Sequence, residues 1–592
     1  MTTLLTAQRD TTARTAPVAL HTRTITGGAL ACEALLAAGV TTLFGYPGGA
    51  ALPFYRELMR YPRLHHVLVR HEQNAAHAAD GYARSTGRVG VCVSTSGPGA
   101  TNLLTGLATA FMDCVPVVAL TGQVARAAIG TQAFQEVDVL GMVGPITKGA
   151  FQLRSAEEIP EVFERAFRLA AEGRPGPVLI DFPKDVQLAS VDVGDELPSF
   201  AASDGEVGVS AAAEFALERA AELLKAAQRP MLIAGHGVAM ANADRELRAF
   251  AEASGVPVGM TLLGMGTFPE NHPQAMGMVG MHGTVQANMA MHHADLVIGV
   301  GMRFDDRVVG RPKDFAPGAR IVHIDVDPKA FGRVVRADVP VLADARSALA
   351  SLTRLTERHE RPLWWSRLRQ WASAHAECGL VNAESAPADE LPTTPEVVRA
   401  LRRVLGGSAI VVSDIGQHQM FVALHHGFDR PNQLLTSGGL GTMGYALPAA
   451  LGVKAAQPGR PVWAVVGDGG FQMSAAELST LVHSKLPVKV LIVNNQCLGM
   501  VRQWQELFYD NVYSHSLLPQ PNFEALAQAH GCWATTVTRR DQLENALREA
   551  ALHPGPSVVD VHVPVEETVY PMVPAGSVPG DVRCVDDVDS SL

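Results

Sequence analysis

The sequence of 592 residues lacks the features that mark membrane or nucleic-acid-binding proteins. No uninterrupted run of 18 apolar residues occurs, which argues against a membrane-spanning helix. Lys and Arg form no dense run and the net charge is −11, so we expect neither nucleic acid nor a membrane surface as a partner. Small molecules are the expected partners, and 47% hydrophobic residues suffice for large cores.

Cysteine is scarce as well. The seven cysteines include no CxxC pair and their number is odd, so we expect neither a disulfide scaffold nor a zinc site, and the composition fits a reducing, cytoplasmic setting. The N-terminus lacks the continuous apolar segment of a secretory signal and is only weakly similar to a transit peptide. We interpret residues 1–22 as a disordered extension.

The chain does contain a repeated sequence pattern. Short β-branched apolar runs end in Gly-rich turns and are followed by Ala/Leu-rich stretches, which predicts an α/β fold of three doubly wound parallel-sheet domains. This pattern is interrupted near residues 190–210 and 382–395, which we interpret as linkers. We expect domains at 23–190, 208–365 and 392–575 and a tail at 576–592. Strands are expected at 91–96, 115–122, 231–235, 296–301, 321–327, 409–414, 462–468 and 488–494.

A candidate metal and phosphate site lies in the third block. Gly467-Asp468-Gly469 ends one apolar run, and Asn494-Asn495 ends the next one, 24 residues later. The carboxyl ends of neighbouring parallel strands share one crevice, where a carboxylate and an amide oxygen suit Mg²⁺. Glycines beside the aspartate let backbone N–H groups approach phosphates. Either half alone would be an ordinary turn, but the spacing and strand placement favour the site.

A candidate catalytic carboxylate lies in the first block. A strand ends near Arg70 and an Ala-rich helix begins at about Glu72. A Glu in the first helical turn is often only a surface residue that complements the helix dipole. The Ala-rich, Gly-containing helix that follows favours a buried terminus instead.

The Gly-Asp-Gly to Asn-Asn spacing resembles the thiamine-diphosphate motif. Over about residues 24–575 the chain is similar to the catalytic subunits of the acetolactate (acetohydroxyacid) synthase family. This resemblance is carried by ordered matches at residues 45–50, 96–102, 134–136, 303–307, 437–445 and 571–576.

The resemblance implies three cofactors: thiamine diphosphate, Mg²⁺ and FAD. Asp468 and Asn495 would bind the metal by side chain and Cys497 by its backbone carbonyl, although relatives often carry His or Glu at that last position. Glu72 would stabilise the imino form of the coenzyme's pyrimidine ring. Because related enzymes take these two parts from different subunits, a homodimer or homotetramer with shared active sites is implied.

Further site residues also follow from the resemblance. Gly48 and Gly49, otherwise a tight turn, would lie beside the reactive carbon. Gln135 and Lys184 would line the substrate channel, although Lys184 could be an ordinary exposed lysine. Met443 would lie beneath the coenzyme, with plain core as the alternative. The diphosphate would be contacted by Gln417, His418, Gly467 and Gly469.

The second block resembles a flavin-binding domain. It has no GxGxxG fingerprint, only a weak Gly-x-Gly at 235–238, and because acetolactate formation has no net redox change the flavin would be structural. The implied flavin contacts are Arg174, Met281, His282, Gly283, Arg303, Asp325 and Asp344.

Substrate selection would fall to the loop at residues 303–307 and the segment at 499–505. Arg307 would bind the carboxylate of the second 2-oxo acid, unless it is a surface ion pair with Asp305 or Asp306. Trp504, with Met500 nearby, would form an apolar wall that favours one more methylene, unless it is only a buried helix residue.

The expected activity is the decarboxylation of pyruvate and transfer of the two-carbon fragment to pyruvate or 2-oxobutyrate. The products, 2-acetolactate and 2-aceto-2-hydroxybutyrate, lead to branched-chain amino acids. The alternatives are a flavin-dependent pyruvate oxidase, an inactive homologue that serves as an oligomer partner and, less favoured, glyoxylate carboligase, which lacks the activating glutamate. The preferred acceptor and binding of a separate regulatory subunit stay open.

Overall fold

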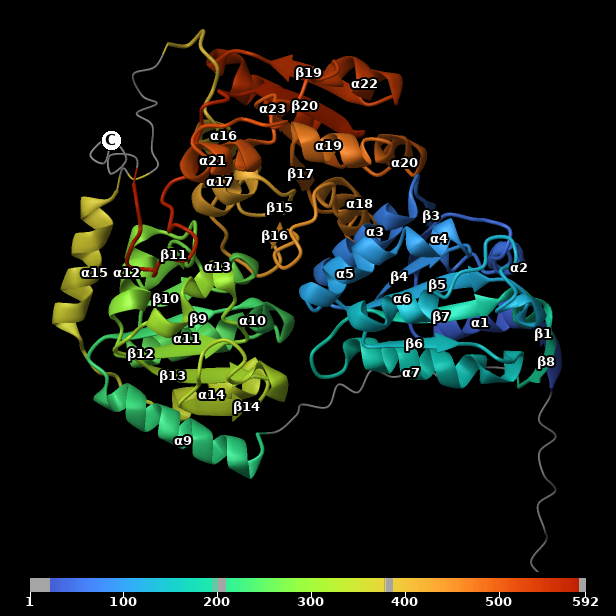
Figure 1. Ribbon diagram of the computed structural model, residues 1–592, viewed down its shortest axis with the longest axis horizontal. Helices are drawn as coiled ribbons and strands as arrows, with labels where there is room; N and C mark the ends of the chain where they lie inside the picture. Colours follow the sequence, from blue (N-terminus) through green and yellow to red (C-terminus); the bar gives the residue numbers. More distant parts are fainter. Residues whose placement is uncertain are drawn as a thin grey trace, which may run out of the picture.

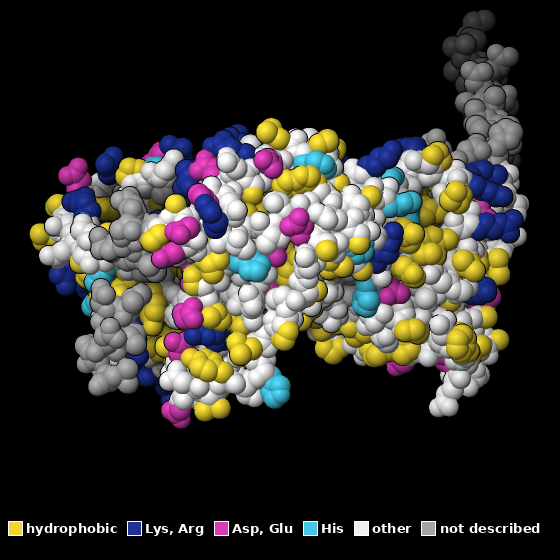
Figure 2. Space-filling model, turned by 90° about the horizontal axis from the view of Figure 1, so that it is seen from above, with side chains coloured by type: hydrophobic (Ala, Val, Ile, Leu, Met, Phe, Trp, Pro, Cys, Tyr) yellow, Lys and Arg dark blue, Asp and Glu magenta, His cyan; other side chains and the backbone are white. Residues whose placement is uncertain are grey.

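A computed structural model describes residues 22–194, 197, 200, 209–376, 378 and 387–584. It contains three six-stranded parallel sheets, each flanked by helices, which confirms the predicted α/β fold (Figure 1). Residues 1–21 of the predicted extension lie outside this description. Among the described residues, no helix has the length and apolar character needed to cross a bilayer. On the face shown in Figure 2, basic side chains lie among acidic and hydrophobic ones.

The first sheet has the order β3-β2-β4-β5-β7-β6, beside a small antiparallel ribbon of β1 and β8. The apolar runs at 91–96 and 115–122 are its two central strands, buried along their whole length. Its strands are β1 (Arg23–Thr26), β2 (Thr42–Gly45), β3 (His65–Leu68), β4 (Gly90–Ser94), β5 (Val117–Gln123), β6 (Gly149–Gln152), β7 (Val178–Pro183) and β8 (Ser190–Val193). The helices are α1 (Gly27–Ala37), α2 (Leu52–Leu58), α3 (Glu72–Thr86), α4 (Pro98–Thr101), α5 (Leu104–Met112), α6 (Val139–Val143), α7 (Ile159–Ala171) and α8 (Lys184–Leu188).

The central sheet has the order β11-β10-β9-β12-β13-β14. Its strands are β9 (Pro230–Ala234), β10 (Val258–Met260), β11 (Ala275–Met278), β12 (Leu296–Val300), β13 (Arg320–Asp325) and β14 (Val339–Leu342). The helices are α9 (Ala211–Ala226), α10 (His236–Met240), α11 (Asp244–Ser254), α12 (Val285–His293), α13 (Asp306–Val309), α14 (Ala345–Leu355) and α15 (Pro362–Ala374).

The third sheet has the order β16-β15-β17-β18-β20-β19. Its strands are β15 (Ile410–Ser413), β16 (Leu434–Leu435), β17 (Val462–Gly467), β18 (Lys489–Asn494), β19 (Trp533–Val537) and β20 (Ser557–His562). The helices are α16 (Thr394–Leu405), α17 (Gln417–His425), α18 (Ala446–Ala456), α19 (Asp468–Ser474), α20 (Glu477–His483), α21 (Gly499–Phe508), α22 (Phe523–Ala529) and α23 (Leu543–Leu552).

The first and third domains meet through helices α3 and α18, which lie side by side at the centre of the molecule (Figure 1). A Cβ on Gly81 would overlap the carbonyl oxygen of Ala449, and one on Gly452 would overlap that of Ala78. Small residues therefore bring the two backbones into contact. This close packing explains why α3 is rich in Ala, the composition from which a buried helix was predicted.

After β20 the chain returns along the central domain, where its red trace runs in Figure 1. The N–H of Val573 donates to the Met281 carbonyl at 2.7 Å, and that of Arg311 donates to the Ser577 carbonyl at 3.1 Å. This return places Cys584 beside the end of α15, where it forms a disulfide with Cys378.

The disulfide corrects the expectation drawn from the scattered cysteines. Cys378 and Cys584 are 206 residues apart, so no local spacing could reveal that the chain brings them together. Within the described residues, no group of three or more His, Cys, Asp or Glu side chains is arranged to hold a metal ion.

Candidate active site

The predicted metal and phosphate residues lie together at one edge of the third sheet. Asp468 begins α19 directly after β17, Asn495 follows β18, and these two strands pair in parallel. The Asn495 amide donates to Gln417 Oε1 at 3.3 Å, and the N–H of Cys497 donates to Asn495 Oδ1 at 3.3 Å. Strand ends and turns thus bring a carboxylate, an amide and a buried backbone segment to one place.

The Asp468 carboxylate is buried. It accepts hydrogen bonds from the N–H of Gly469 at 2.8 Å and from Gln520 Nε2 at 2.6 Å. Burial raises its pKa to about 7, against the lowering effect of the surrounding N–H groups. A buried carboxylate with only neutral donors around it gains strongly from a cation, and oxygen donors of this kind suit Mg²⁺. These residues fit a magnesium ion.

The space next to Asp468 fits a phosphate group. A Cβ on Gly467 would lie 3.0 Å from the His418 ring, and one on Gly469 would lie 3.4 Å from Met443 Cε. His418 Nε2 is buried without a hydrogen-bond partner among the described residues, and burial lowers the pKa of that imidazole to about 4. The surroundings therefore exclude a side chain at both glycines, which keeps the backbone beside Asp468 bare, and the unsatisfied imidazole nitrogen can bind a ligand.

Two polar residues of this region were not singled out from the sequence. Asp414 follows β15 and accepts from the N–H of Gly444, beside Met443, at 3.0 Å; burial raises its pKa to about 7. Gln520 holds Asp468 from a distant loop. Asp414 carries the same signal as Asp468, an acid at the end of an apolar strand, whereas nothing in the local sequence marks Gln520.

The predicted residues of the first domain gather around the turn at residues 95–102. Glu72, the first residue of α3, is half-buried and accepts from Asn102 Nδ2 at 2.9 Å. A Cβ on Gly99 would lie 3.4 Å from Glu72 Oε1, and a Cβ on Gly97 would lie 3.0 Å from Cα of Gln135. Gln135 has a left-handed backbone, with φ at 60°.

The Gly48-Gly49 loop and Lys184 flank this turn. A Cβ on Gly48 would clash with Thr95 Cγ2 at 2.5 Å, whereas one on Gly49 would meet nothing within 4 Å. Lys184 begins α8 and is exposed, and Gln187 of the same helix donates to the Ala50 carbonyl at 2.8 Å. The loop and the helix are therefore fixed to each other, with Gly49 and Lys184 open to a partner or a substrate.

Among the described residues, Glu72 and Asp468 share no hydrogen bond. Glu72 is held by Asn102 of its own domain, and the hydrogen-bond partners of Asp468 belong to the third domain. The neighbour of Gln135, Phe134, is 89% exposed, an unusual state for a large apolar side chain.

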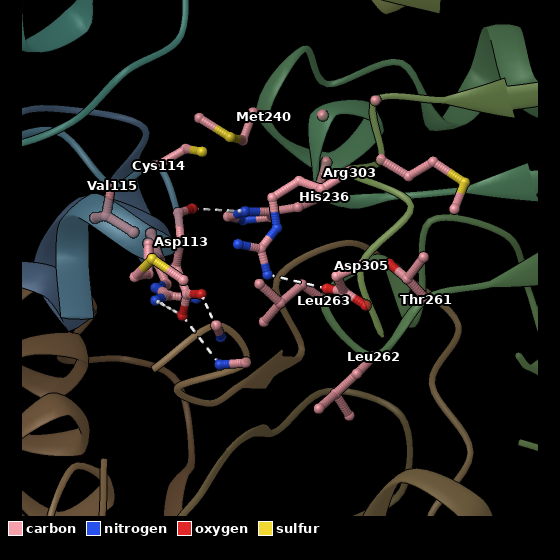
Figure 3. Close-up of a pocket in the computed structure, with 18 of the residues that line it drawn as sticks. Asp113, Cys114, Val115, His236, Met240, Thr261, Leu262, Leu263, Arg303 and Asp305 are labelled. Atoms are coloured by element: carbon pink, nitrogen blue, oxygen red, sulfur yellow. Dashed lines mark hydrogen bonds and ion pairs between the residues drawn. The ribbon is translucent and has the colours of Figure 1, made fainter. Parts of the chain in front are cut away.

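A cavity of about 950 Å³ lies where all three domains meet. Figure 3 shows Asp113 and Cys114 of the first domain on one side and Arg303, Asp305 and Thr261 of the central domain on the other. Six of the seven predicted flavin contacts line it, namely Arg174, Met281, His282, Arg303, Asp325 and Asp344. Gly283 does not; it forms a turn, donating to the carbonyl of Gly280 at 2.8 Å.

The cavity wall is mostly apolar but carries several charged side chains and one buried polar atom without a partner among the described residues. Arg174 Nε donates to Cys114 Sγ at 3.0 Å, and Arg303 pairs with Asp305 at 3.0 Å. The Asp344 carboxylate already caps α14 by accepting from the N–H of Arg346 at 2.9 Å. His282 is buried with Nδ1 unpartnered among the described residues. The cavity is at the upper end of the usual size for ligand sites and fits a group as large as a flavin dinucleotide.

The predicted specificity residues share a wall of the same cavity. The guanidinium carbon of Arg307 lies 5.9 Å from the centre of the Trp504 ring, and Met500 and Trp504 both lie on α21. Arg307 also pairs with Asp306 at 3.7 Å, but its side chain is 58% exposed, so that pair is weak and leaves the guanidinium able to bind another carboxylate.

Three family models match the chain in order. They describe a thiamine pyrophosphate enzyme: its N-terminal TPP binding domain at residues 25–142, its central domain at 217–352 and its C-terminal TPP binding domain at 414–561. Thiamine pyrophosphate is another name for thiamine diphosphate.

Relatives match almost end to end. The acetolactate synthase large subunit of Corynebacterium glutamicum is 45% identical over 94% of this chain and 90% of its own length. The acetolactate synthase isozyme 3 large subunit of Escherichia coli is 43% identical, over 93% and 96%. The probable acetolactate synthase large subunit of Methanocaldococcus jannaschii is 45% identical, over 92% and 93%. The chain therefore belongs to the acetolactate synthase large-subunit family of thiamine-diphosphate enzymes.

Proposed function

We propose that this protein is an acetolactate synthase. It removes CO₂ from pyruvate and joins the remaining two-carbon fragment to the keto carbon of pyruvate or 2-oxobutyrate, giving 2-acetolactate or 2-aceto-2-hydroxybutyrate for branched-chain amino acid biosynthesis. The observation that carries the proposal is the contact between Arg307 and Trp504 in the cavity wall, since it pairs a carboxylate-binding cation with an apolar surface. A second 2-oxo acid needs both.

Different residues of the chain bind the coenzyme, the metal ion and the substrate. Thiamine diphosphate, when bound, supplies the electron sink that allows a 2-oxo acid to lose CO₂. Glu72 hydrogen-bonds the pyrimidine ring and stabilises its imino form. Asn102 orients the Glu72 carboxylate for this role. Asp468, Asn495 and the Cys497 carbonyl hold magnesium, and Gln417 and His418 contact the diphosphate. The backbone at Gly49 is open to the reacting oxygen of the substrate.

Arg307 orients the acceptor by its carboxylate, while Met500 and Trp504 exclude water from its alkyl end. Gln135 and Lys184 line the route by which the acid enters. FAD occupies the large cavity as a structural group, contacted by Arg174, Met281, His282, Arg303 and Asp325. This flavin assignment is supported by the cavity's size and by the buried His282 Nδ1, which has no partner among the described residues.

We also propose that the working protein is a homodimer or homotetramer whose active sites each combine Glu72 of one chain with Asp468 of another. The absence of a hydrogen bond between Glu72 and Asp468 among the described residues and the exposed Phe134 support this arrangement. The names of its large-subunit relatives imply a smaller partner for those proteins, and a regulatory subunit is proposed here on that ground. The sequence predicts a cytoplasmic location, and the Cys378–Cys584 disulfide would then have to persist in a reducing compartment.

The test is to incubate the purified chain with pyruvate and 2-oxobutyrate, thiamine diphosphate and Mg²⁺, with and without FAD, and to identify the products. Acetolactate and acetohydroxybutyrate, without oxygen uptake, are expected. Oxygen or quinone reduction driven by pyruvate would identify an oxidase, and the absence of CO₂ release would identify an inactive homologue.

A further inference from the structure

Glu477, the first residue of α20, is a buried acid of the third domain that contacts the first domain. Its Oε1 accepts from the backbone N–H of Arg70 at 2.7 Å and from Asn74 Nδ2 at 2.9 Å. Its other oxygen accepts from the Thr480 hydroxyl at 2.6 Å, which lies 3.2 Å from the Leu68 carbonyl. One carboxylate therefore connects α20 to the chain on both sides of Glu72.

The position of these bonds matters because the backbone is least supported there. Arg70 lies between the end of β3 at Leu68 and the start of α3 at Glu72, so neither a strand ladder nor a helix supplies an acceptor for its N–H. Glu477 supplies that acceptor from another domain. This bond is therefore one of the contacts at the start of α3, together with the His71 side chain, which accepts from the N–H of Gln73 at 3.1 Å.

We propose that Glu477 is a positioning residue for the reaction: by holding Arg70 and Asn74 it fixes the Glu72 carboxylate at the place where it must meet the coenzyme's pyrimidine ring. The inference rests on the proposed function. Glu477 does not touch the coenzyme or substrate, and acts only through Glu72. A misplacement of about 1 Å at a reacting group can lower the rate about 10²-fold, so loss of this support should lower the rate substantially.

A purely structural role for Glu477 is less well supported, because the other end of α3 is already fixed to the third domain. Arg84 donates to Asp80 at 2.7 Å and to the Thr436 carbonyl at 3.2 Å, and the Tyr445 hydroxyl donates to Asp80 at 2.6 Å. With the close contact of α3 and α18, these bonds keep the domains together when Glu477 is removed. Only the Glu72 end is then released.

The first test compares Glu477→Ala with Glu477→Gln. The amide of Gln keeps an acceptor for Arg70 and Asn74, so kcat should stay within about threefold of the wild type, whereas Ala should lower kcat about 30- to 100-fold. The KM for pyruvate should change less than about twofold, because no group that binds substrate is removed. Asn74→Ala, which deletes one bond and leaves the buried acid, should give an intermediate loss.

Glu270→Ala is the matched control. Glu270 is also an acid that joins two domains, by accepting from the N–H of Phe428 at 2.9 Å, but it contacts nothing near Glu72. It should lower the melting temperature and leave kcat unchanged.

The second test is a double-mutant cycle. If Glu477 acts through Glu72, Glu477→Ala should lower kcat no more than about twofold in a Glu72→Gln background, so the effects are not additive. Additive losses, or a Gln variant as slow as the Ala variant, would overturn the proposal.

Hydrogen exchange separates this inference from the proposed function. Backbone amides at residues 70–75 should exchange faster in coenzyme-free Glu477→Ala than in the wild type, while those of β17 should not change. Unchanged exchange at residues 70–75 overturns the positioning role whatever the activity. A wild type that makes no acetolactate refutes the proposed function, yet leaves this measurement intact.

Discussion

Arg307 and Trp504 come from different domains, α13 of the central domain and α21 of the third, and meet in a cation–aromatic contact at 5.9 Å. Each side chain supports the other: the ring fixes a guanidinium that is otherwise mostly exposed, and the cation fixes the ring face. In the proposed function, acceptor recognition would therefore depend on how the two domains are placed, and not on either domain alone.

Trp504→Leu should lower the preference for 2-oxobutyrate over pyruvate as acceptor about tenfold, because a wall that contacts one extra methylene is worth about 1–3 kcal/mol. The ratio of acetohydroxybutyrate to acetolactate from a mixture of the two acids measures it. Trp365→Leu, which removes a Trp from α15, is the control and should keep the ratio. An unchanged ratio in Trp504→Leu would refute the assigned wall.

Arg307→Ala should raise the concentration of acceptor needed for half-maximal rate at least tenfold, because the carboxylate loses its cation, and Arg307→Lys should restore only part, because an ammonium cannot bind bidentately. Steady-state kinetics with varied acceptor measure both. Arg320, an exposed arginine paired with Asp338 at 2.9 Å, provides the matched Ala control.

Asp468→Asn should weaken thiamine diphosphate binding about 100-fold at fixed Mg²⁺, because the amide cannot neutralise the metal. Gln520→Ala, which removes the hydrogen bond to Asp468 and the one that Gln520 accepts from Gln472, should cost about tenfold. Fluorescence titration of the chelator-treated protein measures both affinities. Equal binding by Asp468→Asn and the wild type would place the metal elsewhere.

Glu270 should make the protein less stable as the pH rises from about 4.5 to about 7. Burial, with the nearby Asp429 carboxylate, raises the pKa of Glu270 from 4.5 to about 7, so the folded state holds a proton that the unfolded state releases. The stabilisation is complete below about pH 4.5 and is lost through about pH 7. Melting temperatures at about pH 5 and pH 8 should show the wild type falling relative to Glu270→Gln. A constant difference between the two proteins would contradict this.

Cys584→Ser should release the C-terminal segment at residues 573–584. In the wild type the disulfide with Cys378 ties the end of this segment to α15, while the hydrogen bonds of Val573 and Arg311 hold its start. Limited proteolysis followed by mass spectrometry should show faster cleavage within this segment in the variant, and also in the wild type under a dithiol reductant. Cys532→Ser, at a buried free thiol, should leave that cleavage rate unchanged.

Local chemistry explains what could be predicted. The strand that precedes Asp468 and the helix that begins at Glu72 lie where apolar runs and Gly-rich turns place them, because burial of parallel strands leaves a clear pattern. The family resemblance, rather than periodicity, supplied Arg307 and Trp504, and the structure brings these two into contact.

What the sequence could not predict are contacts between distant segments. Gln520 reaches Asp468 from a loop, Glu477 reaches Arg70 from another domain, and Cys378 meets Cys584 across the molecule. None of these pairs has a characteristic spacing, since their proximity is created only when the three domains pack. Asp414 differs from these pairs, because it does carry a local signal, an acid at the end of an apolar strand, as Asp468 does.

The touching backbones at Gly81 and Gly452 limit how this enzyme can move. Carbonyl oxygens fill the space beside both glycines, so a slide of α3 along α18 would bring backbone atoms into collision and is disfavoured. Admission of an acid and release of a larger product would then come from the parts outside this helix pair. Those parts are the central domain with Arg307, the loop before α22 and the C-terminal segment at residues 573–584, whose end is held by the disulfide of Cys584.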